Sequence, residues 1–448
     1  MRKILYLLTI VSLFTFIACS EEDEILIPDV EIENVSELTS IAQGDTVYLK
    51  AKINTVQPSS FTWAVNGEKA ESTDLTFVFV PAEVGKHVVT LTCSNNAGEA
   101  FAALEIDVYG KYKYGTYVLN EGNMTSETGS LIFISPKGVV TDSAYWRVNG
   151  RHLGNVCQDL FIADNKIYII SQNGGTSAVG TAYECEGFLA VANAETLKRE
   201  AAYNDELSTL SWPTHIAVMG NEAFIRDNSG VHSFNTSTKK LTLINGTSGA
   251  LKNRMAVAGG KVFVPANRAV LVLEAGKSEV SHKITFDATV SGVIKTSDGN
   301  IYVSTTGTPN KITKIKVSDY SVIKTSEVTV GSLGAGWGAT PGISAKGDTI
   351  YYGNASINIY RHIFTTGTSE LLVKASDYVS EDAGMAYNNL AVHPVTGEVY
   401  QTTIKGYGLD YLKNNISVFN FSQSQPELTA NYKHYTHFPA GIFFTYDF

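Results

Sequence analysis

The stretch Leu160-Phe-Ile-Ala-Asp-Asn-Lys-Ile-Tyr168 decides the fold, because variants of it recur along the chain. An apolar strand is followed by a tight turn of Gly, Asn or Asp, and then by a strand with an aromatic residue near its start. Two short apolar runs around such a turn are typical of a β-hairpin. The further copies are Ile216-Ala-Val-Met-Gly-Asn-Glu-Ala-Phe224, Met255-Ala-Val-Ala-Gly-Gly-Lys-Val-Phe263, Val293 to Tyr302, Ile343 to Tyr351 and Leu390 to Tyr400.

The spacing of these hairpins predicts a β-propeller. The turns lie roughly 40 to 55 residues apart without helical periodicity between them, which matches four strands per blade. The six complete copies account for six blades. A seventh is split between the chain ends, because Gly115-Thr-Tyr-Val-Leu119 looks like a second strand and Phe438-Pro-Ala-Gly-Ile-Phe-Phe444 like a first strand. Their pairing would close the ring and remove an exposed sheet edge. We predict seven blades over residues 111–448, with six or eight as the alternatives.

Residues 28–110 form a separate unit. Apolar and polar residues alternate with period two, as in Phe61-Thr-Trp-Ala-Val65, and turn signals such as Asn66-Gly67 separate the runs. About six or seven short strands of this kind favour an immunoglobulin-like β-sandwich with Trp63 in its core. The order of these strands resembles PKD-type bacterial surface modules, which implies a spacer. The sequence thus predicts an all-β protein of two domains.

The first residues have the composition of an export signal. Arg2 and Lys3 precede an apolar run, residues 4–17, and Ala18-Cys19 follows. A Cys directly after a small residue resembles a lipobox, in which the cysteine is acylated and becomes the first residue of the mature chain. The usual Leu three positions before the Cys is Phe16 here. We therefore assign residues 1–19 to a lipoprotein signal, with an ordinary secretory signal as the alternative.

Residues 20–27 form an acidic linker. The run Ser20-Glu-Glu-Asp-Glu24 resembles the surface-export signal of Bacteroidetes lipoproteins, and the alternative is a solvated spacer. No later stretch is apolar enough to span a bilayer, so a lipid on Cys19 is the only membrane attachment we expect. The resemblance implies an outer-membrane protein that faces the cell exterior.

Composition and motifs narrow the functional classes. The formal net charge is −10 and Lys and Arg are not clustered, so we expect no nucleic-acid partner. We find no nucleophile elbow, zinc-protease motif or phosphate loop, and we expect neither a cofactor nor enzymatic activity. Asp159 and Asn388 are the only side chains placed for an axial divalent ion, so we assign no metal site.

The loops predict a binding face at one end of the ring. Turns between first and second strands are short, whereas the loops at the other end are long and rich in aromatic and amide residues, as in residues 172–186 and 405–411. Binding residues concentrate on such loops. The alternative to ligand binding is packing between blades for each aromatic residue, and a hydrogen-bonded position at the rim for each histidine. The candidate residues are Asn120, Glu121, Asp159, Gln172, Trp212, His215, Arg226, Arg254, Trp337, Tyr387, Asn388, Tyr407 and His437.

Two cysteines are expected on the same face. Cys157 begins a first strand and Cys185 lies in the long loop of the same blade. An oxidising envelope permits a disulfide between them, although pairing requires a geometry that sequence alone does not supply. We state this disulfide as a hypothesis.

The whole pattern resembles Bacteroidetes surface lipoproteins with a YncE-like propeller, on the lipobox, the acidic run and the opening Asn120-Glu121-Gly122. One class of these, the BtuG-type proteins, captures cobalamin for a TonB-dependent transporter. The resemblance implies a small-molecule or glycan ligand and such a transporter as partner. A protein- or glycan-adhesion module is the first alternative, and a metal-dependent hydrolase or lyase is the second.

Overall fold

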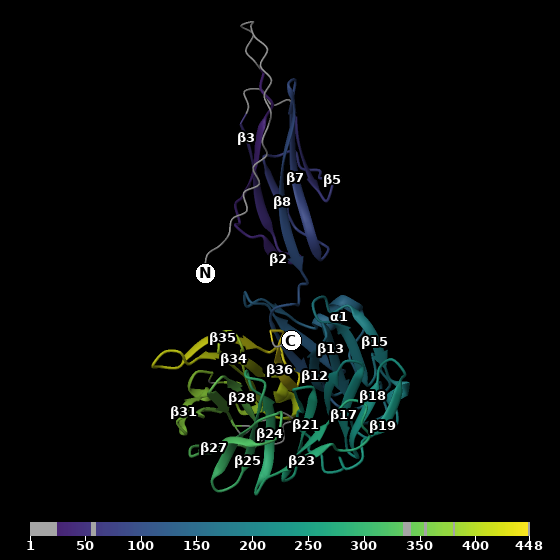
Figure 1. Ribbon diagram of the computed structural model, residues 1–448, viewed down its shortest axis with the longest axis vertical. Coiled ribbons are helices and arrows are strands. Elements are labelled where there is room, and N and C mark those ends of the chain that lie inside the picture. Colours follow the sequence, from purple (N-terminus) through teal and green to yellow (C-terminus); the bar gives the residue numbers. More distant parts are fainter. Residues whose placement is uncertain (1–24, 55–59, 335–341, 354–355, 380, 447–448) are drawn as a thin grey trace. The chain divides into compact units, whose positions relative to one another are not determined.

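The computed structural model describes residues 25–54, 60–334, 342–353, 356–379 and 381–446. Cys19, most of the acidic linker and Trp337 lie outside these residues. The chain divides into two compact units, Met1–Tyr109 and Gly110–Phe448 (Figure 1). Within the described residues, no helix has both the length and the apolar character needed to cross a membrane.

The first unit is a β-sandwich. Its smaller sheet has the order β1 (Asp29–Asn34), β3 (Val47–Asn54) and β6 (Thr76–Phe79). Its larger sheet has the order β2 (Ser40–Ala42), β8 (Gly98–Tyr109), β7 (Gly85–Asn95), β4 (Ser60–Val65) and β5 (Glu68–Lys69). Trp63 is fully buried between them, stacks on Phe77 at 5.2 Å and donates from Nε1 to the Asp74 carbonyl at 3.0 Å. The predicted sandwich and the core position of Trp63 are confirmed.

The second unit contains seven four-stranded antiparallel sheets, which we call blades 1 to 7 (Figure 1). In each, the strands below run from the innermost outward. Blade 1 has β36 (Pro439–Phe444), β9 (Thr116–Asn120), β10 (Ser130–Ile134) and β11 (Val140–Thr141), and blade 2 has β12 (Cys157–Ala163), β13 (Lys166–Ser171), β14 (Leu189–Asn193) and β15 (Arg199–Tyr203). Blade 3 has β16 (His215–Met219), β17 (Glu222–Asp227), β18 (Gly230–Asn235) and β19 (Lys240–Leu243), and blade 4 has β20 (Ala256–Ala258), β21 (Lys261–Ala266), β22 (Ala269–Leu273) and β23 (His282–Thr285).

The remaining elements complete this unit. Blade 5 has β24 (Thr289–Lys295), β25 (Ile301–Thr306), β26 (Asn310–Ile315) and β27 (Val322–Val328), and blade 6 has β28 (Ile343–Lys346), β29 (Thr349–Tyr352), β30 (Asn358–Ile363) and β31 (Thr368–Lys374). Blade 7 has β32 (Met385–Val392), β33 (Val399–Ile404), β34 (Asn414–Asn420) and β35 (Glu427–Lys433). The helical segments are α1 (Ala144–Asn149), η1 (Asp205–Leu207), η2 (Ala375–Asp377) and η3 (Gly408–Leu412).

The ring closes through the two ends of this unit. β36 pairs antiparallel with β9, with Pro439 opposite Asn120 and Phe444 opposite Thr116. The innermost strand of each blade contacts that of the next blade around the whole circle. The split blade and the total of seven blades are therefore confirmed.

Apolar side chains pack between neighbouring blades. One cluster joins blades 1 and 2 through residues such as Tyr117 and Leu160, and another joins blades 7 and 1 through Ile416 and Ile442. Because neighbouring blades cover both of its faces, every residue of β9, the second strand of blade 1, is buried. The chemistry of the propeller is consequently left to the loops at the strand ends.

Candidate binding site

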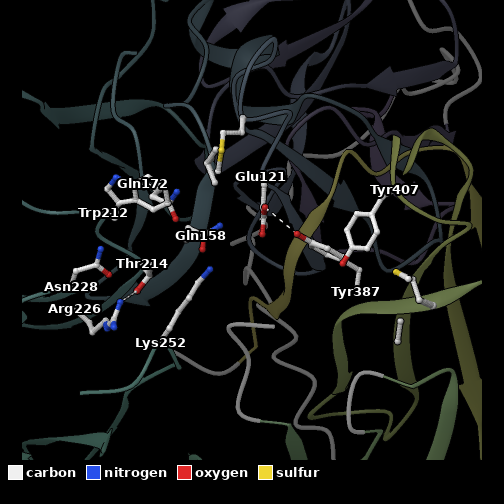
Figure 2. Close-up of a pocket in the computed structure, with 14 residues that line it drawn as sticks. Glu121, Gln158, Gln172, Trp212, Thr214, Arg226, Asn228, Lys252, Tyr387 and Tyr407 are labelled. Atoms are coloured by element: carbon white, nitrogen blue, oxygen red, sulfur yellow. Dashed lines mark hydrogen bonds between the residues drawn. The ribbon is translucent and has the colours of Figure 1, made fainter. Parts of the chain in front are cut away.

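A cavity of about 730 Å³ opens where loops of five blades converge (Figure 2). Its volume is within the range of ligand pockets in proteins. Its lining residues lie in or next to the ends of strands of blades 1, 2, 3, 4 and 7. They are Glu121, Met124, Val156, Gln158, Gln172, Trp212, Thr214, Arg226, Asn228, Lys252, Met385, Ala386, Tyr387 and Tyr407.

The structure brings six of the candidate residues to this cavity. Trp212 and Tyr387 lie on opposite sides, with Tyr407 beside Tyr387 and Glu121 between the two sides (Figure 2). The other two of the six are Gln172 and Arg226.

Trp212 is held in an unusual backbone conformation. Its φ is 54°, a left-handed value that is rare for a bulky residue, and Pro213 follows it. Its side chain remains 53% exposed although it is large and apolar. Strain of this kind persists where the surrounding structure over-determines it and is concentrated at functional sites. The loop therefore presents the indole to the cavity rather than to the core.

Glu121 and Tyr387 form the hydrogen bond that joins blades 1 and 7 at the cavity. The Tyr387 hydroxyl donates to Oε2 of Glu121 at 3.3 Å. Burial raises the pKa of Tyr387 well above its usual range, and the adjacent carboxylate raises it further. The phenol therefore stays protonated at neutral pH and remains a donor.

Arg226 and Lys252 supply positive charge from blades 3 and 4. Arg226 donates from Nη1 to Thr214 Oγ1 at 3.2 Å and from Nε to the Ala250 carbonyl at 3.3 Å. Burial lowers the pKa of both cations. Lys252 is nevertheless exposed to solvent, because it lines the open cavity.

Lys252 and Asn228 also line the cavity, although the sequence pattern did not predict them there. Only their positions in the chain could have indicated this, since Lys252 lies four residues before β20 and Asn228 lies directly after β17. Both positions correspond to the long-loop end of a blade. Neither residue is aromatic or part of a notable cluster, so residue type alone did not point to them.

Three candidates form a buried network instead of lining the cavity. Nε of Arg254 donates to Oδ1 of Asp159 at 2.8 Å, and Nδ1 of His215 lies 3.3 Å from Oδ2. Burial alone would raise the pKa of Asp159, but Arg254 and His215 hold it below its ordinary value. Burial lowers the pKa of His215, and Asp159 partly opposes this. These side chains are directed toward one another rather than into the cavity, and Asp159 and His215 are fully buried.

Asn120 and His437 secure the ring closure and do not line the cavity. Asn120 is fully buried and accepts a hydrogen bond at Oδ1 from the His437 backbone amide at 3.1 Å. His437 Nδ1 lies 3.0 Å from Oε2 of Glu127. The backbone of Asn388 belongs to β32, while its side chain, like all of Trp337, lies outside the described residues.

The structure does not contain the hypothesised disulfide. Cys157 and Cys185 are both free thiols. Sγ of Cys157 contacts the Gly154 carbonyl at 3.5 Å, whereas Sγ of Cys185 contacts the Gly174 carbonyl at 3.8 Å. The two thiols are thus directed to different backbone groups.

Among the described residues, no group of three or more His, Cys, Asp or Glu side chains is arranged to hold a metal ion.

Fold and cavity together define a class of protein: a β-sandwich module followed by a seven-bladed β-propeller with a decorated cavity at its long-loop end. Residues 33–108 match the PKD domain. Residues 114–445 match the family described as "Domain of unknown function (DUF5074)", and the chain belongs to this family.

Among solved structures, one shows the same kind of fold and a second matches part of the chain. A quinonprotein alcohol dehydrogenase-like protein from Bacteroides thetaiotaomicron is 15% identical, with a TM-score of 0.55 over 92% of this chain and 99% of that chain. A protein of unknown function from Bacteroides caccae is 14% identical, with a TM-score of 0.33 over 48% of this chain and 69% of that chain. The first likeness shows the fold alone. No curated protein matches the chain.

Proposed function

We propose that the propeller is a ligand-binding module of a cell-surface lipoprotein and that the cavity captures a nutrient for an outer-membrane transporter. One observation carries this proposal. Six residues selected from sequence for binding, in four different blades, line a single cavity of about 730 Å³. A cavity that combines aromatic walls with a few fixed polar groups suits a flat, partly polar ligand.

Binding rather than catalysis fits the way the polar groups are held. Glu121 accepts a hydrogen bond from Tyr387, and Arg226 is fixed by Thr214. Such groups present directed hydrogen bonds to a ligand without needing to change their protonation state at neutral pH. We therefore infer a non-catalytic site.

The cargo and the transporter are the finer parts of the proposal. The lipobox at Cys19 and the acidic run that follows it support anchoring in the outer membrane with the propeller facing outward. The resemblance to YncE-like and BtuG-type proteins supports a TonB-dependent transporter as partner and makes cobalamin one candidate cargo. Replacing Cys19 with Ala should move the protein from the membrane fraction to the soluble fraction of fractionated cells.

The binding proposal is tested with the mature, unlipidated chain and a panel of corrinoids and glycans. We expect at least one class to raise the melting temperature and to give a saturable heat in calorimetry. Trp212→Ala should abolish that heat while leaving the melting temperature of the free protein nearly unchanged. Trp146→Ala is the matched control, because Trp146 is 46% exposed but lies on α1 and does not line the cavity. Equal loss in both variants, or a collapse in stability of Trp212→Ala, would contradict the proposal.

A further inference from the structure

One wall of the cavity carries two cations, Arg226 and Lys252, that form no ion pair with any residue described by the structure. Among the described residues, no carboxylate lies within ion-pair distance of Arg226 or Lys252. The guanidinium of Arg226 bonds only to a hydroxyl and a backbone carbonyl. The adjacent Asp227 is engaged elsewhere, since its carboxylate accepts hydrogen bonds from Ser229 and from the backbone amide of Ser211.

The Lys252 ammonium forms neither a hydrogen bond nor an ion pair with any residue that the structure describes. Burial lowers its pKa, Glu121 opposes this shift, and Arg226 adds to it. Glu121 is nevertheless too far for an ion pair and accepts the Tyr387 hydroxyl instead. Bringing two like charges together in partly desolvated surroundings is unfavourable unless an anion compensates them. This cost is notable in a chain whose formal net charge is −10.

A third polar group at the same wall lacks a partner. Gln158 is only 2% exposed, lines the cavity, and its Oε1 has no hydrogen-bond partner among the described residues. Figure 2 shows the Lys252 side chain extended into the cavity toward Gln158. Buried side-chain amides normally form hydrogen bonds, so the Gln158 oxygen at the cavity is available to a ligand group. Rotation of the amide lets it offer either its NH₂ group or its oxygen.

The other side of the cavity has the opposite character. Glu121 presents the only carboxylate among the lining residues, next to Tyr387 and Tyr407. A ligand that spans the cavity therefore meets cations at blades 3 and 4 and an acceptor at blade 1, with aromatic surfaces on both sides. This polarity favours a ligand with an acidic end and hydrogen-bond donors at the other end.

We propose that the captured ligand carries a carboxylate or phosphate group, which Arg226 and Lys252 bind together with the Gln158 amide. The body of the ligand is cyclic or flat and packs against Trp212 and Tyr387. This inference rests on the proposed binding function and specifies the chemistry of its ligand. Arg and Lys differ in geometry, so Arg226 would orient the anion while Lys252 acts as a mobile point charge.

The test uses probes that differ in a single group. Calorimetry on the mature chain compares 4-nitrophenyl β-D-glucuronide, its methyl ester and 4-nitrophenyl β-D-glucoside, with 4-nitrophenyl phosphate as the phosphate arm. We expect the glucuronide or the phosphate to bind at least about tenfold more tightly than the two uncharged glycosides, as hydrogen bonds to charged groups predict. The tighter of the two acidic probes identifies the anion as carboxylate or phosphate. Its affinity should fall as the salt concentration rises.

Variants of the cavity assign the effect to these residues. Arg226→Gln and Lys252→Gln should each weaken the acidic probe about tenfold and weaken the uncharged glycosides distinctly less. Lys252→Arg should restore most of the affinity for the acidic probe. Lys240→Gln, on exposed β19 of blade 3, is the matched control. Equal affinity for the glucuronide and the glucoside overturns the anion site but leaves the capture function standing. Failure of both acidic probes to bind at millimolar concentrations also overturns the anion site.

Discussion

Arg254 and Asp159 form an ion pair between two blades that are not neighbours in the ring. Nε of Arg254 donates to Oδ1 of Asp159 at 2.8 Å, although 95 residues separate the two in the chain. Asp159 lies in the inner strand of blade 2, Arg254 lies just before blade 4, and His215 of blade 3 contacts the same carboxylate. The guanidinium also lies 4.1 Å over the ring of Phe443 in blade 1. One network thus ties together four blades.

This network also positions the cavity. Gln158 and Thr214 each precede a network residue by one position, and Lys252 precedes Arg254 by two. Fixing Asp159, His215 and Arg254 therefore restricts the backbone that carries these three lining residues. We regard the network members as positioning residues for the binding site.

Asp159→Asn should destabilise the propeller. The substitution leaves the Arg254 guanidinium partly buried without its counter-charge, and removing one member of a buried pair costs about 3 to 5 kcal/mol. We expect a loss of this order in the free energy of unfolding, measured by urea titration. Asp164→Asn is the control, because Asp164 lies in an exposed turn where Asn tolerates the left-handed backbone. A change below about 1 kcal/mol for Asp159→Asn would show that the pair is dispensable.

Gly441→Ala tests the close approach of Arg254 to β36. A Cβ at Gly441 would lie 1.9 Å from Nη2 of Arg254, so the guanidinium would have to move away from Asp159. We expect a loss of about 1 to 3 kcal/mol, as for overpacking in other cores. Gly249→Ala offers a matched comparison, since nothing lies within 4 Å of its Cβ position. Thermal unfolding of the two variants measures the difference, and equal melting temperatures would contradict the contact.

Stability should fall on mild acidification. Burial lowers the pKa values of His215, His362 and His393. The unfolded chain then binds more protons than the folded chain below the unfolded histidine pKa of about 6.5, so stability is lost as the pH falls through that value. Urea unfolding at neutral pH and near pH 5.5 measures this loss while the carboxylates remain ionised.

A histidine variant provides the control for the pH experiment. His362→Gln should reduce the pH dependence, because His362 bonds to Ser326 and Ser369 through its two ring nitrogens and loses one acceptor on protonation. The free energy of unfolding of this variant at neutral pH is expected to drop as well. The quantity compared is therefore the change in that free energy between neutral pH and pH 5.5. Greater stability at pH 5.5 than at neutral pH would refute the assignment.

The free cysteines give a further prediction. Burial raises the thiol pKa of Cys157 well above its usual range and that of Cys185 to a smaller extent, so little reactive thiolate forms. Iodoacetamide should label Cys185 before Cys157 in the folded protein, as read from the masses of its peptides. Reductant should leave the melting temperature unchanged. A disulfide-linked peptide containing both residues would show that the structure describes the reduced form only.

Residue type predicted part of the cavity lining. Trp212 and Tyr407 lie in loops and Tyr387 lies near the start of β32, all at the long-loop end of the ring, where large aromatic residues are candidates for binding. Asp159, His215 and Arg254 were candidates as polar residues at the same end of the ring, but they bond to one another in a buried network instead. Adjacent residues on a strand face opposite directions, and the irregular pairing between Cys157 and Asp159 shifts that alternation.

The sequence by itself determined the architecture, because a hairpin repeated at a regular spacing can bury its apolar faces only against further copies of itself. It also determined the closing strand, since β36 and β9 are each incomplete without the other. Only the tertiary structure decided which polar residues meet the cavity and that Lys252 belongs there. Their directions depend on bulges and on contacts between blades far apart in the chain, which no local pattern of residues specifies.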